Sequence, residues 1–109
     1  MAYEFITYSV EDRIGTITIN RPDKLNALND ATMLELDSAI EEACDTEELG
    51  GLIVTGSGKA FVAGADISEL ASKKPREARE MALRGQKICG KLENAAMRVI
   101  ASVNGFALG

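Results

Sequence analysis

Hydrophobic and polar residues alternate near the start of the chain, in the pattern of strands that bury one face. Residues 5–10 alternate and are rich in β-forming residues, and residues 13–20 place Ile17 and Ile19 together on one face. A short polar turn separates the two segments, so they are predicted to form a hairpin. Pro22 is expected to end the second strand, because proline has no N–H to donate to a central ladder.

Two later segments repeat their apolar residues every three or four positions, which predicts amphipathic helices. The first covers about residues 31–45 and follows an N-cap signal at Asn29 and Asp30. Its apolar stripe consists of Met33, Leu36, Ile40, Ala43 and Cys44. The second covers about residues 75–94 and begins with Pro75, which suits the first position of a helix. Its stripe consists of Ala78, Met81, Ala82, Gly85, Ile88, Cys89 and Leu92.

A short apolar run follows each predicted helix, at residues 52–55 and 99–103. A strand, a helix and a further strand predict a right-handed crossover between parallel strands. The chain is therefore predicted to be α/β, with its main elements in the order ββαβαβ. Its 109 residues are enough for one domain with a modest core.

Composition and charge narrow the classes of function. A content of 46% hydrophobic and 27% charged residues is typical of a globular chain. The net charge of −5 argues against nucleic acid as a partner, because binding to phosphates needs clustered lysine and arginine. The first residues lack the pattern of a signal peptide, and no apolar run approaches the length that spans a membrane. We therefore expect a cytoplasmic protein with no membrane partner.

Histidine is absent, and cysteine occurs twice, at Cys44 and Cys89. Without histidine, a Ser-His-Asp or Cys-His nucleophile system is excluded within this chain. Two distant cysteines do not have the spacing of a zinc site, so no metal site is predicted. Both cysteines fall in apolar helical patterns, and they are expected to be buried free thiols.

The stretch 60–70 is the main candidate for chemistry. An apolar run at residues 52–54 leads into it, and small residues flank Gly64, so another group can approach the backbone closely there. Asp66, followed three residues later by Glu69, predicts a helix start with a capping box. The free N–H groups at a helix start stabilise negative charge, such as charge on a carbonyl oxygen. On the residues alone, a capped helix start with a purely structural role is the alternative.

Gly56 and Gly58, followed by Lys59 and Ala60, raise the alternative of a phosphate-binding loop. The full pattern is not met, because Ile53 occupies the position of the first glycine and Ala60 replaces the serine or threonine. A turn between a strand and the following loop is therefore the preferred interpretation.

Three segments, in this order, resemble the crotonase (enoyl-CoA hydratase/isomerase) superfamily. They are residues 18–28 (Thr-Ile-Asn-Arg-Pro-Asp-Lys-Leu-Asn-Ala-Leu), 61–67 (Phe-Val-Ala-Gly-Ala-Asp-Ile) and 100–109 (Ile-Ala-Ser-Val-Asn-Gly-Phe-Ala-Leu-Gly). The resemblance covers essentially the whole chain. It implies the N-terminal part of the crotonase (ClpP/crotonase-like) spiral fold, truncated, because members of the superfamily have a domain more than twice this length. Residues 1–109 would then be a single partial domain.

The resemblance also implies a set of site residues. In crotonases, the backbone N–H at the position of Ala65 is one of two donors to the oxygen of a thioester substrate. Ala63, Asp66 and Ile67 would line the acyl-CoA site beside it. Lys24, Leu25 and Ala27 would form part of the wall that contacts the pantetheine and nucleotide of coenzyme A. Coenzyme A enters as part of the substrate, and no further cofactor is expected.

The activity that the resemblance implies is the addition of water across the trans-2,3 double bond of an enoyl-CoA, in the setting of fatty acid β-oxidation. Isomerisation is the alternative within the superfamily, because it uses the same enolate with different acid/base residues. The second oxyanion donor and the catalytic glutamates of the superfamily follow Gly109, so the 109-residue chain alone is expected to be inactive. The second hypothesis is a non-catalytic domain that binds acyl-CoA or only self-associates. The resemblance implies a homo-oligomer, which is a trimer or hexamer in full-length members.

Overall fold

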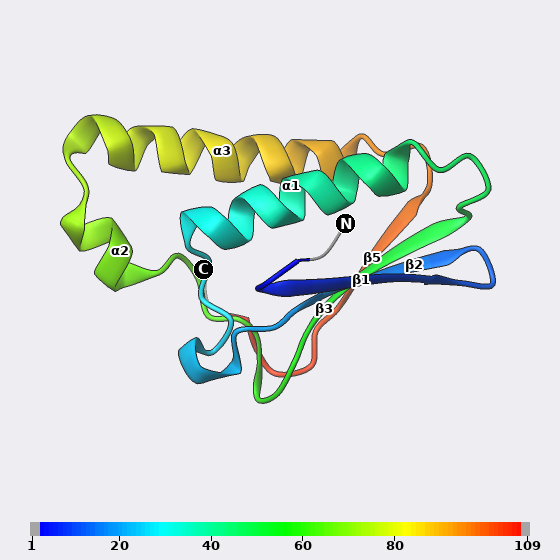
Figure 1. Cartoon of the computed structure of the whole chain (residues 1–109), viewed down its shortest axis with the longest axis horizontal. Helices are drawn as coiled ribbons and strands as arrows, with labels where there is room; N and C mark the ends of the chain where they lie inside the picture. The colour runs from blue at the N-terminus through cyan, green and yellow to red at the C-terminus, as the bar shows by residue number, and fades with distance from the viewer. Residues whose placement is uncertain (1–2, 108–109) are drawn as a thin grey trace.

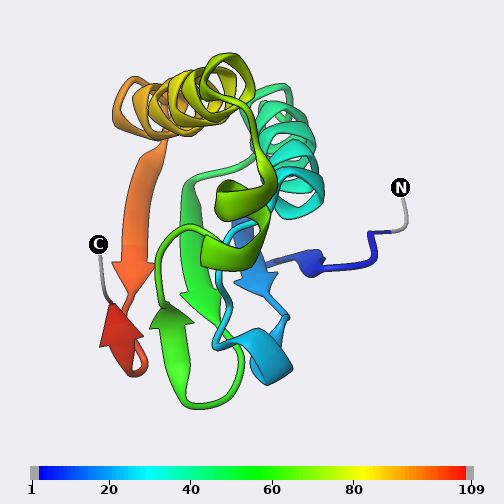
Figure 2. The ribbon, with the colours of Figure 1, turned by 90° about the vertical axis from the view of Figure 1, so that its left-hand side faces the viewer.

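Two long helices lie side by side over one face of a four-stranded sheet, as Figures 1 and 2 show from two directions. The computed structural model describes residues 3–107, including every side chain in that range except those of Ile67 and Phe106. The larger elements follow in the order β1, β2, α1, β3, α3 and β5, with shorter ones between them. The predicted α/β class and the ββαβαβ order are therefore confirmed.

The first two strands form the predicted hairpin. Strand β1 (Ile6–Glu11) pairs antiparallel with β2 (Ile14–Ile19), and Glu11 lies opposite Ile14 at the closed end. The two residues of the turn, Asp12 and Arg13, have positive φ angles of 52° and 69°. Two-residue hairpin turns favour this backbone conformation, because it matches the right-handed twist of the paired strands.

The rest of the sheet is parallel. Strand β3 (Gly51–Gly56) pairs parallel with β2, and β5 (Arg98–Ser102) pairs parallel with β3, so the order across the sheet is β1-β2-β3-β5. Each parallel pair is joined by a helical connection, which parallel strands require because a tight turn cannot link them. The predicted crossover from β2 to β3 is present and contains the helix α1 (Asp30–Cys44).

The helices begin close to where the sequence signals place them. The side chain of Asn29 accepts a hydrogen bond from the N–H of Thr32 (2.9 Å) and caps α1. The helix α3 (Pro75–Glu93) has proline in its first turn, as predicted. Between them lies the six-residue helix α2 (Ile67–Ser72), which follows the candidate stretch.

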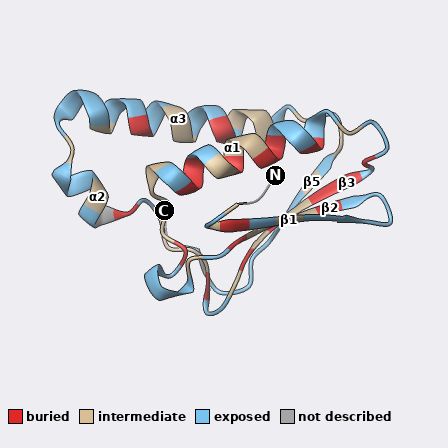
Figure 3. Cartoon of the chain, viewed as in Figure 1, coloured by how far each residue is buried: buried red, intermediate tan, exposed pale blue. Residues whose placement is uncertain are grey.

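The core lies between the sheet and the two long helices, where buried residues of both layers face one another (Figure 3). Ile17, Ile40 and Leu52 are at most 1% exposed. Removing such side chains from water is the main favourable contribution to folding, at about 1.5–3 kcal/mol for each. The core cluster comprises Ile6, Ile17, Ile19, Met33, Leu36, Ala39, Ile40, Ala43, Leu49, Leu52, Met81 and Ile88.

The prediction that both cysteines are buried was wrong. Cys44 and Cys89 are exposed, whereas the residue before each of them, Ala43 and Ile88, is buried. Successive residues of a helix point about 100° apart, so a narrow apolar stripe includes one of two neighbours and turns the other away.

Three short elements were not predicted. A 3-10 helix covers Pro22–Lys24, and a small parallel sheet pairs β4 (Ala60–Val62) with β6 (Phe106–Ala107). Elements of two or three residues are too short to show a hydrophobic period, and tertiary contacts determine whether they form. This small sheet brings the segment 100–109 beside the segment 61–67, both of which carry the family resemblance. Residues 108–109 lie outside the part of the chain that the structure describes.

We expect Gly56→Ala to destabilise the fold and Gly90→Ala to stabilise it. A Cβ atom at Gly56 would lie well inside contact distance of the carbonyl oxygens of Phe61 and Ala60, which are backbone atoms that cannot rotate away. At Gly90, in α3, a Cβ would meet nothing within 4 Å. Urea unfolding should show a loss of about 1–3 kcal/mol for the first variant and a gain of up to about 1 kcal/mol for the second. Equal stability of the two variants would contradict the close packing at Gly56.

Candidate functional site

The two loops that the sequence assigns to one site run side by side and are hydrogen-bonded through their backbones. The N–H of Ala63 donates to the carbonyl oxygen of Leu25 (3.1 Å), and the N–H of Leu28 donates to that of Gly64 (2.8 Å). The N–H of Asp66 donates in turn to the carbonyl oxygen of Leu28 (2.9 Å). Segments 25–28 and 63–66 therefore form a short parallel pairing, although they lie far apart in the sequence.

This pairing determines which way the backbone of Ala65 faces. Ala65 is the bridge partner of Leu28, but both hydrogen bonds of the bridge use its neighbours, Gly64 and Asp66. In a parallel bridge of this kind, the N–H of the central residue lies on the side away from the partner strand. Within residues 3–107, no backbone hydrogen bond uses the N–H of Ala65. The backbone that leads into this position needs glycine, because Gly64 has a φ of 119°, which L side chains rarely adopt.

Ala65 lies at the wall of a cavity of about 670 Å³. The wall is formed by the two loops, by one face of α1 and by the facing sides of α2 and α3. Most of its residues are apolar: Leu28, Met33, Leu36, Gly64, Ala65, Leu70, Ala78, Met81, Ala82, Gly85, Ile88, Cys89 and Gly90, with Gln86 and Glu93 as the polar members. A cavity of this size with an apolar wall suits the hydrocarbon part of a small molecule.

A buried asparagine holds the first loop in shape. Asn26 is fully buried, and its side-chain oxygen accepts from the N–H of Arg21 (2.7 Å). Its amide nitrogen donates to the carbonyl oxygens of Ser57 (2.9 Å) and Ala60 (2.8 Å). Asn26 also has a φ of 58°, a conformation that asparagine tolerates better than most residues. The sequence analysis assigned no role to Asn26, because an asparagine directly after a turn does not indicate that its side chain is buried.

An ion pair connects the two loops. Both terminal nitrogens of the Arg21 guanidinium lie 3.3 Å from Oδ2 of Asp66, and one of them also donates to the carbonyl oxygen of Ala27. The other carboxylate oxygen of Asp66 accepts from the hydroxyl of Ser68 (2.7 Å) and from the N–H of Glu69 (3.3 Å). The pKa of Asp66 is held below its ordinary value, mainly by the hydrogen bond from Ser68. The hydrogen bond from the N–H of Glu69 and the contact with Arg21 lower the pKa further.

The predicted capping box at Asp66 is only half formed. Asp66 is the N-cap of α2, as predicted. The side chain of Glu69, however, does not return to Asp66; it accepts from the N–H of Asp30 (3.1 Å), at the start of α1. That N–H belongs to a helix start, where unpaired donors and the helix dipole attract a carboxylate.

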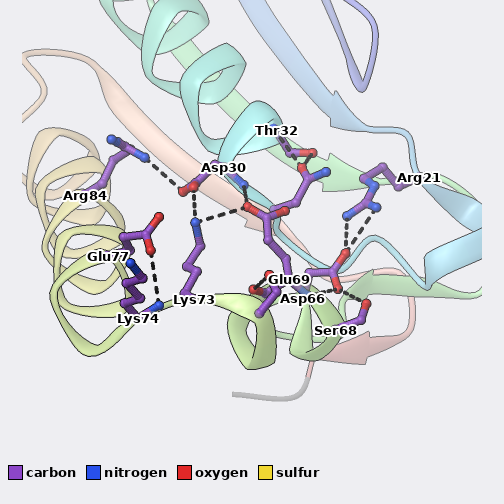
Figure 4. A network of polar contacts seen from close by, with 12 residues as sticks. Arg21, Asp30, Thr32, Asp66, Ser68, Glu69, Lys73, Lys74, Glu77 and Arg84 are labelled. Atoms are coloured by element: carbon purple, nitrogen blue, oxygen red, sulfur yellow. Dashed lines mark hydrogen bonds and ion pairs between the residues drawn. The ribbon is translucent and has the colours of Figure 1, made fainter.

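Charged side chains connect the start of α1 with the end of α2 and the middle of α3 (Figure 4). The carboxylate of Asp30 accepts from Lys73 (2.5 Å), which follows α2, and from Arg84 of α3 (2.9 Å). The hydrogen bond from Lys73 is the main cause that lowers the pKa of Asp30. The same hydrogen bond raises the pKa of Lys73. These contacts hold α2, and therefore the end of the segment 63–66, against α1 and α3.

The predicted site residues fall into two groups. Leu25, Ala63, Ala65 and Asp66 meet in the paired segments, and the carbonyl oxygen of Ala27 joins them through Arg21. The other group lies at the margins: Lys24 is exposed at the end of the 3-10 helix, and Ile67 is the first residue of α2. Of the predicted residues, Ala65 lines the cavity.

Comparison with known proteins identifies the family. A model of the family "Enoyl-CoA hydratase/isomerase" matches residues 9–109. The chain belongs to this family. It is 46% identical, over its whole length, to a crotonyl-CoA hydratase of Syntrophomonas wolfei, of which it covers 42%. It is 47% identical to a short-chain-enoyl-CoA hydratase of Clostridium acetobutylicum, where the match covers 91% of this chain and 38% of the relative.

Solved structures show the same fold. The crystal structure of an enoyl-CoA hydratase from Bacillus anthracis superposes on 97% of this chain with a TM-score of 0.93 at 30% sequence identity, and the match covers 42% of that protein. An enoyl-CoA hydratase from Thermoplasma volcanium superposes on 93% with a TM-score of 0.87 at 32% identity. The chain therefore has the N-terminal part of the crotonase fold, and it spans about two-fifths of the length of these relatives.

Within residues 3–107, no group of three or more histidine, cysteine, aspartate or glutamate side chains is placed to hold a metal ion. In the same range, none of the helices has both the length and the hydropathy to cross a membrane.

We expect Asn26→Leu to destabilise the fold strongly. The variant has a side chain of similar size but leaves the N–H of Arg21 and the carbonyl oxygens of Ser57 and Ala60 without this partner. An unpaired buried polar group costs about 1–3 kcal/mol, so the loss should reach several kcal/mol in chemical denaturation. Asn20→Ala is the control, since exposed Asn20 loses one hydrogen bond with Ser57 (2.8 Å). Similar losses in the two variants would contradict the role of Asn26.

The stability of the fold should fall in acid through Asp30. Because the pKa of Asp30 is lowered in the folded chain, its contribution is complete above the unfolded pKa, about 3.9, and is lost as pH falls through the lower folded pKa. Asp30→Asn should therefore make the decline in unfolding free energy below about pH 4 shallower. The matched control is Asp23→Asn, at an exposed residue of the 3-10 helix for which no ion pair is described. An unchanged slope in Asp30→Asn would argue against this linkage.

Proposed function

We propose that this chain forms part of an enoyl-CoA hydratase and supplies one of the two N–H donors that stabilise the enolate. The observation that carries the proposal is the backbone of Ala65: its N–H faces away from the paired segment, and Ala65 lies at the wall of an apolar cavity. A thioester oxygen can accept from that N–H while the acyl group occupies the cavity.

The chemistry needs such a donor. As the oxygen of water bonds to C3 of the enoyl group, a base takes one proton from that water and the π electrons move toward the thioester oxygen. An acid then gives a proton to C2, so that one molecule of water is added across the double bond. The negative charge peaks on the thioester oxygen in the enolate. A fixed N–H stabilises that charge without reorganising, and removing one such donor costs about 10²–10³ in rate in comparable sites.

The other predicted residues would bind the rest of the substrate. Leu25 and Ala27 lie along the first of the paired segments and would form part of the wall for the pantetheine arm, and Ala63 would line the acyl-CoA site beside them. Lys24 is exposed and would meet the phosphates of the nucleotide, while Asp66 and Ile67 would lie near its adenine end. Coenzyme A is bound as part of the substrate, and no resident cofactor is required.

The names of the relatives support hydration rather than another reaction of the superfamily, since two of them are a crotonyl-CoA hydratase and a short-chain-enoyl-CoA hydratase. Glu69 is engaged at the start of α1, so it is not assigned as an acid or base. We propose that another part of the protein supplies the acid/base carboxylates and the second donor, and that the protein is a cytoplasmic homo-oligomer acting in fatty acid β-oxidation. An enoyl-CoA isomerase would use the same donor with other acid/base groups.

A chimera with a relative tests the proposal. This chain replaces the matching N-terminal part of the Syntrophomonas wolfei crotonyl-CoA hydratase, and the loss of the enoyl absorbance of crotonyl-CoA is followed. We expect hydration well above background, and a fall of about 10²–10³ when lactic acid replaces Ala65, because the resulting ester has no N–H. The isolated 109-residue chain should remain at background.

A second ester provides the control. Lactic acid in place of Ala63 removes the N–H that donates to Leu25, so it weakens the pairing without removing the proposed oxyanion donor. It should lower the melting temperature and reduce the rate much less than the ester at Ala65. A folded chimera whose rate is insensitive to the ester at Ala65 would refute the oxyanion role. Full hydratase activity in the isolated chain would refute the need for further residues.

A further inference from the structure

Arg21 contacts both loops of the site without taking part in the cavity wall. Its guanidinium donates to the carbonyl oxygen of Ala27 on one loop and to Oδ2 of Asp66 on the other. These two acceptors lie immediately beside Leu28 and Ala65, the residues of the bridge. Arg21 is not among the residues that line the cavity.

The surroundings of Arg21 hold its side chain in one place. The side chain is 10% exposed, and that of Asp66 is 12% exposed. The guanidinium carbon lies 5.5 Å from the centre of the Phe5 ring, which adds a cation–π contact. The backbone N–H of Arg21 also donates to Asn26, so the residue is fixed at both its ends. An ion pair this sheltered from water is screened little by salt.

The contacts require arginine in particular. The guanidinium is planar and presents several N–H groups in a fixed fork, so it can serve a carbonyl oxygen and a carboxylate at once. A lysine ammonium is a single point of charge on a flexible stem, and it cannot keep both acceptors at the same spacing. The distance between Ala27 and Asp66 therefore fixes the orientation of segment 63–66 relative to segment 25–28.

We infer that Arg21 is a positioning residue for the reaction: it fixes the direction of the Ala65 N–H by clamping Ala27 and Asp66 on either side of the Leu28–Ala65 bridge. This inference rests on the proposed function, in which that N–H binds the thioester oxygen. Arg21 itself touches no substrate. Its loss should therefore reduce turnover more than substrate binding, because a donor that is misdirected by even 1 Å stabilises the transition state poorly.

The direction of the N–H bond can be measured without any catalysis. Residual dipolar couplings of the ¹⁵N-labelled chain report the orientation of each N–H bond relative to the rest of the fold. In Arg21→Lys, we expect the coupling of Ala65 to change while those of α1 and β3 stay the same. Arg76→Lys is the control, since Arg76 is 91% exposed and pairs with Glu80 on the surface of α3. An unchanged Ala65 coupling in folded Arg21→Lys would overturn the inference.

The second readout uses the chimeric hydratase. Arg21→Lys should lower kcat by about ten- to a hundredfold and change KM for crotonyl-CoA less than threefold, and guanidinium ion should restore part of the activity of Arg21→Ala. A purely stabilising role predicts a lower melting temperature with normal kcat below it, and that result would also overturn the inference. Failure of the proposed function looks different: the Ala65 coupling would still respond to Arg21→Lys, but the parent chimera would not hydrate crotonyl-CoA.

Discussion

The hydrogen bonding between segments 25–28 and 63–66 is the contact on which the rest of this site depends. It uses the backbone groups on either side of Ala65 and leaves the N–H of Ala65 itself to face the other way. An N–H inside a sheet is taken by a neighbouring strand, and an N–H inside a helix donates to the preceding turn. Here the short pairing leaves the N–H of Ala65 without a backbone acceptor within residues 3–107, beside an apolar cavity. Because Ala65 is exposed, a ligand can reach this N–H and accept from it in place of water.

The larger fold serves this pairing by bringing its two segments together. The first segment follows β2 and the second follows β4, close after β3, and β2 and β3 are neighbours in the parallel sheet. The ends of adjacent parallel strands lie at the same edge, so the loops that follow them meet there. The long helices lie over one face of the sheet, and their apolar residues provide both part of the core and part of the wall of the cavity. Strand order and helix packing thus bring the two segments together, and the side chains of Asn26 and Arg21 then fix how the segments are arranged.

The sequence predicted the regular elements well, because strands and helices of five or more residues show their period in the pattern of apolar residues. It failed for residues whose exposure or hydrogen-bond partner is determined by tertiary contacts. Cys44 lies next to the apolar stripe of α1 and turns away from it, and Glu69 finds a better donor at the start of α1 than at its own helix. Arg21 and Asn26 have roles that depend on acceptors far along the chain, which no local pattern reveals. Ala65 was found through the resemblance to a family, since an alanine in a loop carries no chemical signal of its own.

The central claim is that the Ala65 N–H binds the thioester oxygen of an enoyl-CoA, and isotope-edited infrared spectroscopy tests it most directly. Crotonyl-CoA labelled with ¹³C at the thioester carbonyl is bound to the chimera, and the carbonyl stretch is compared with that of the free thioester. A hydrogen bond from a fixed donor polarises the carbonyl, so the stretch should move to lower frequency, and part of that shift should vanish when lactic acid replaces Ala65. A bound carbonyl whose frequency is the same with the amide and with the ester at position 65 would contradict the account.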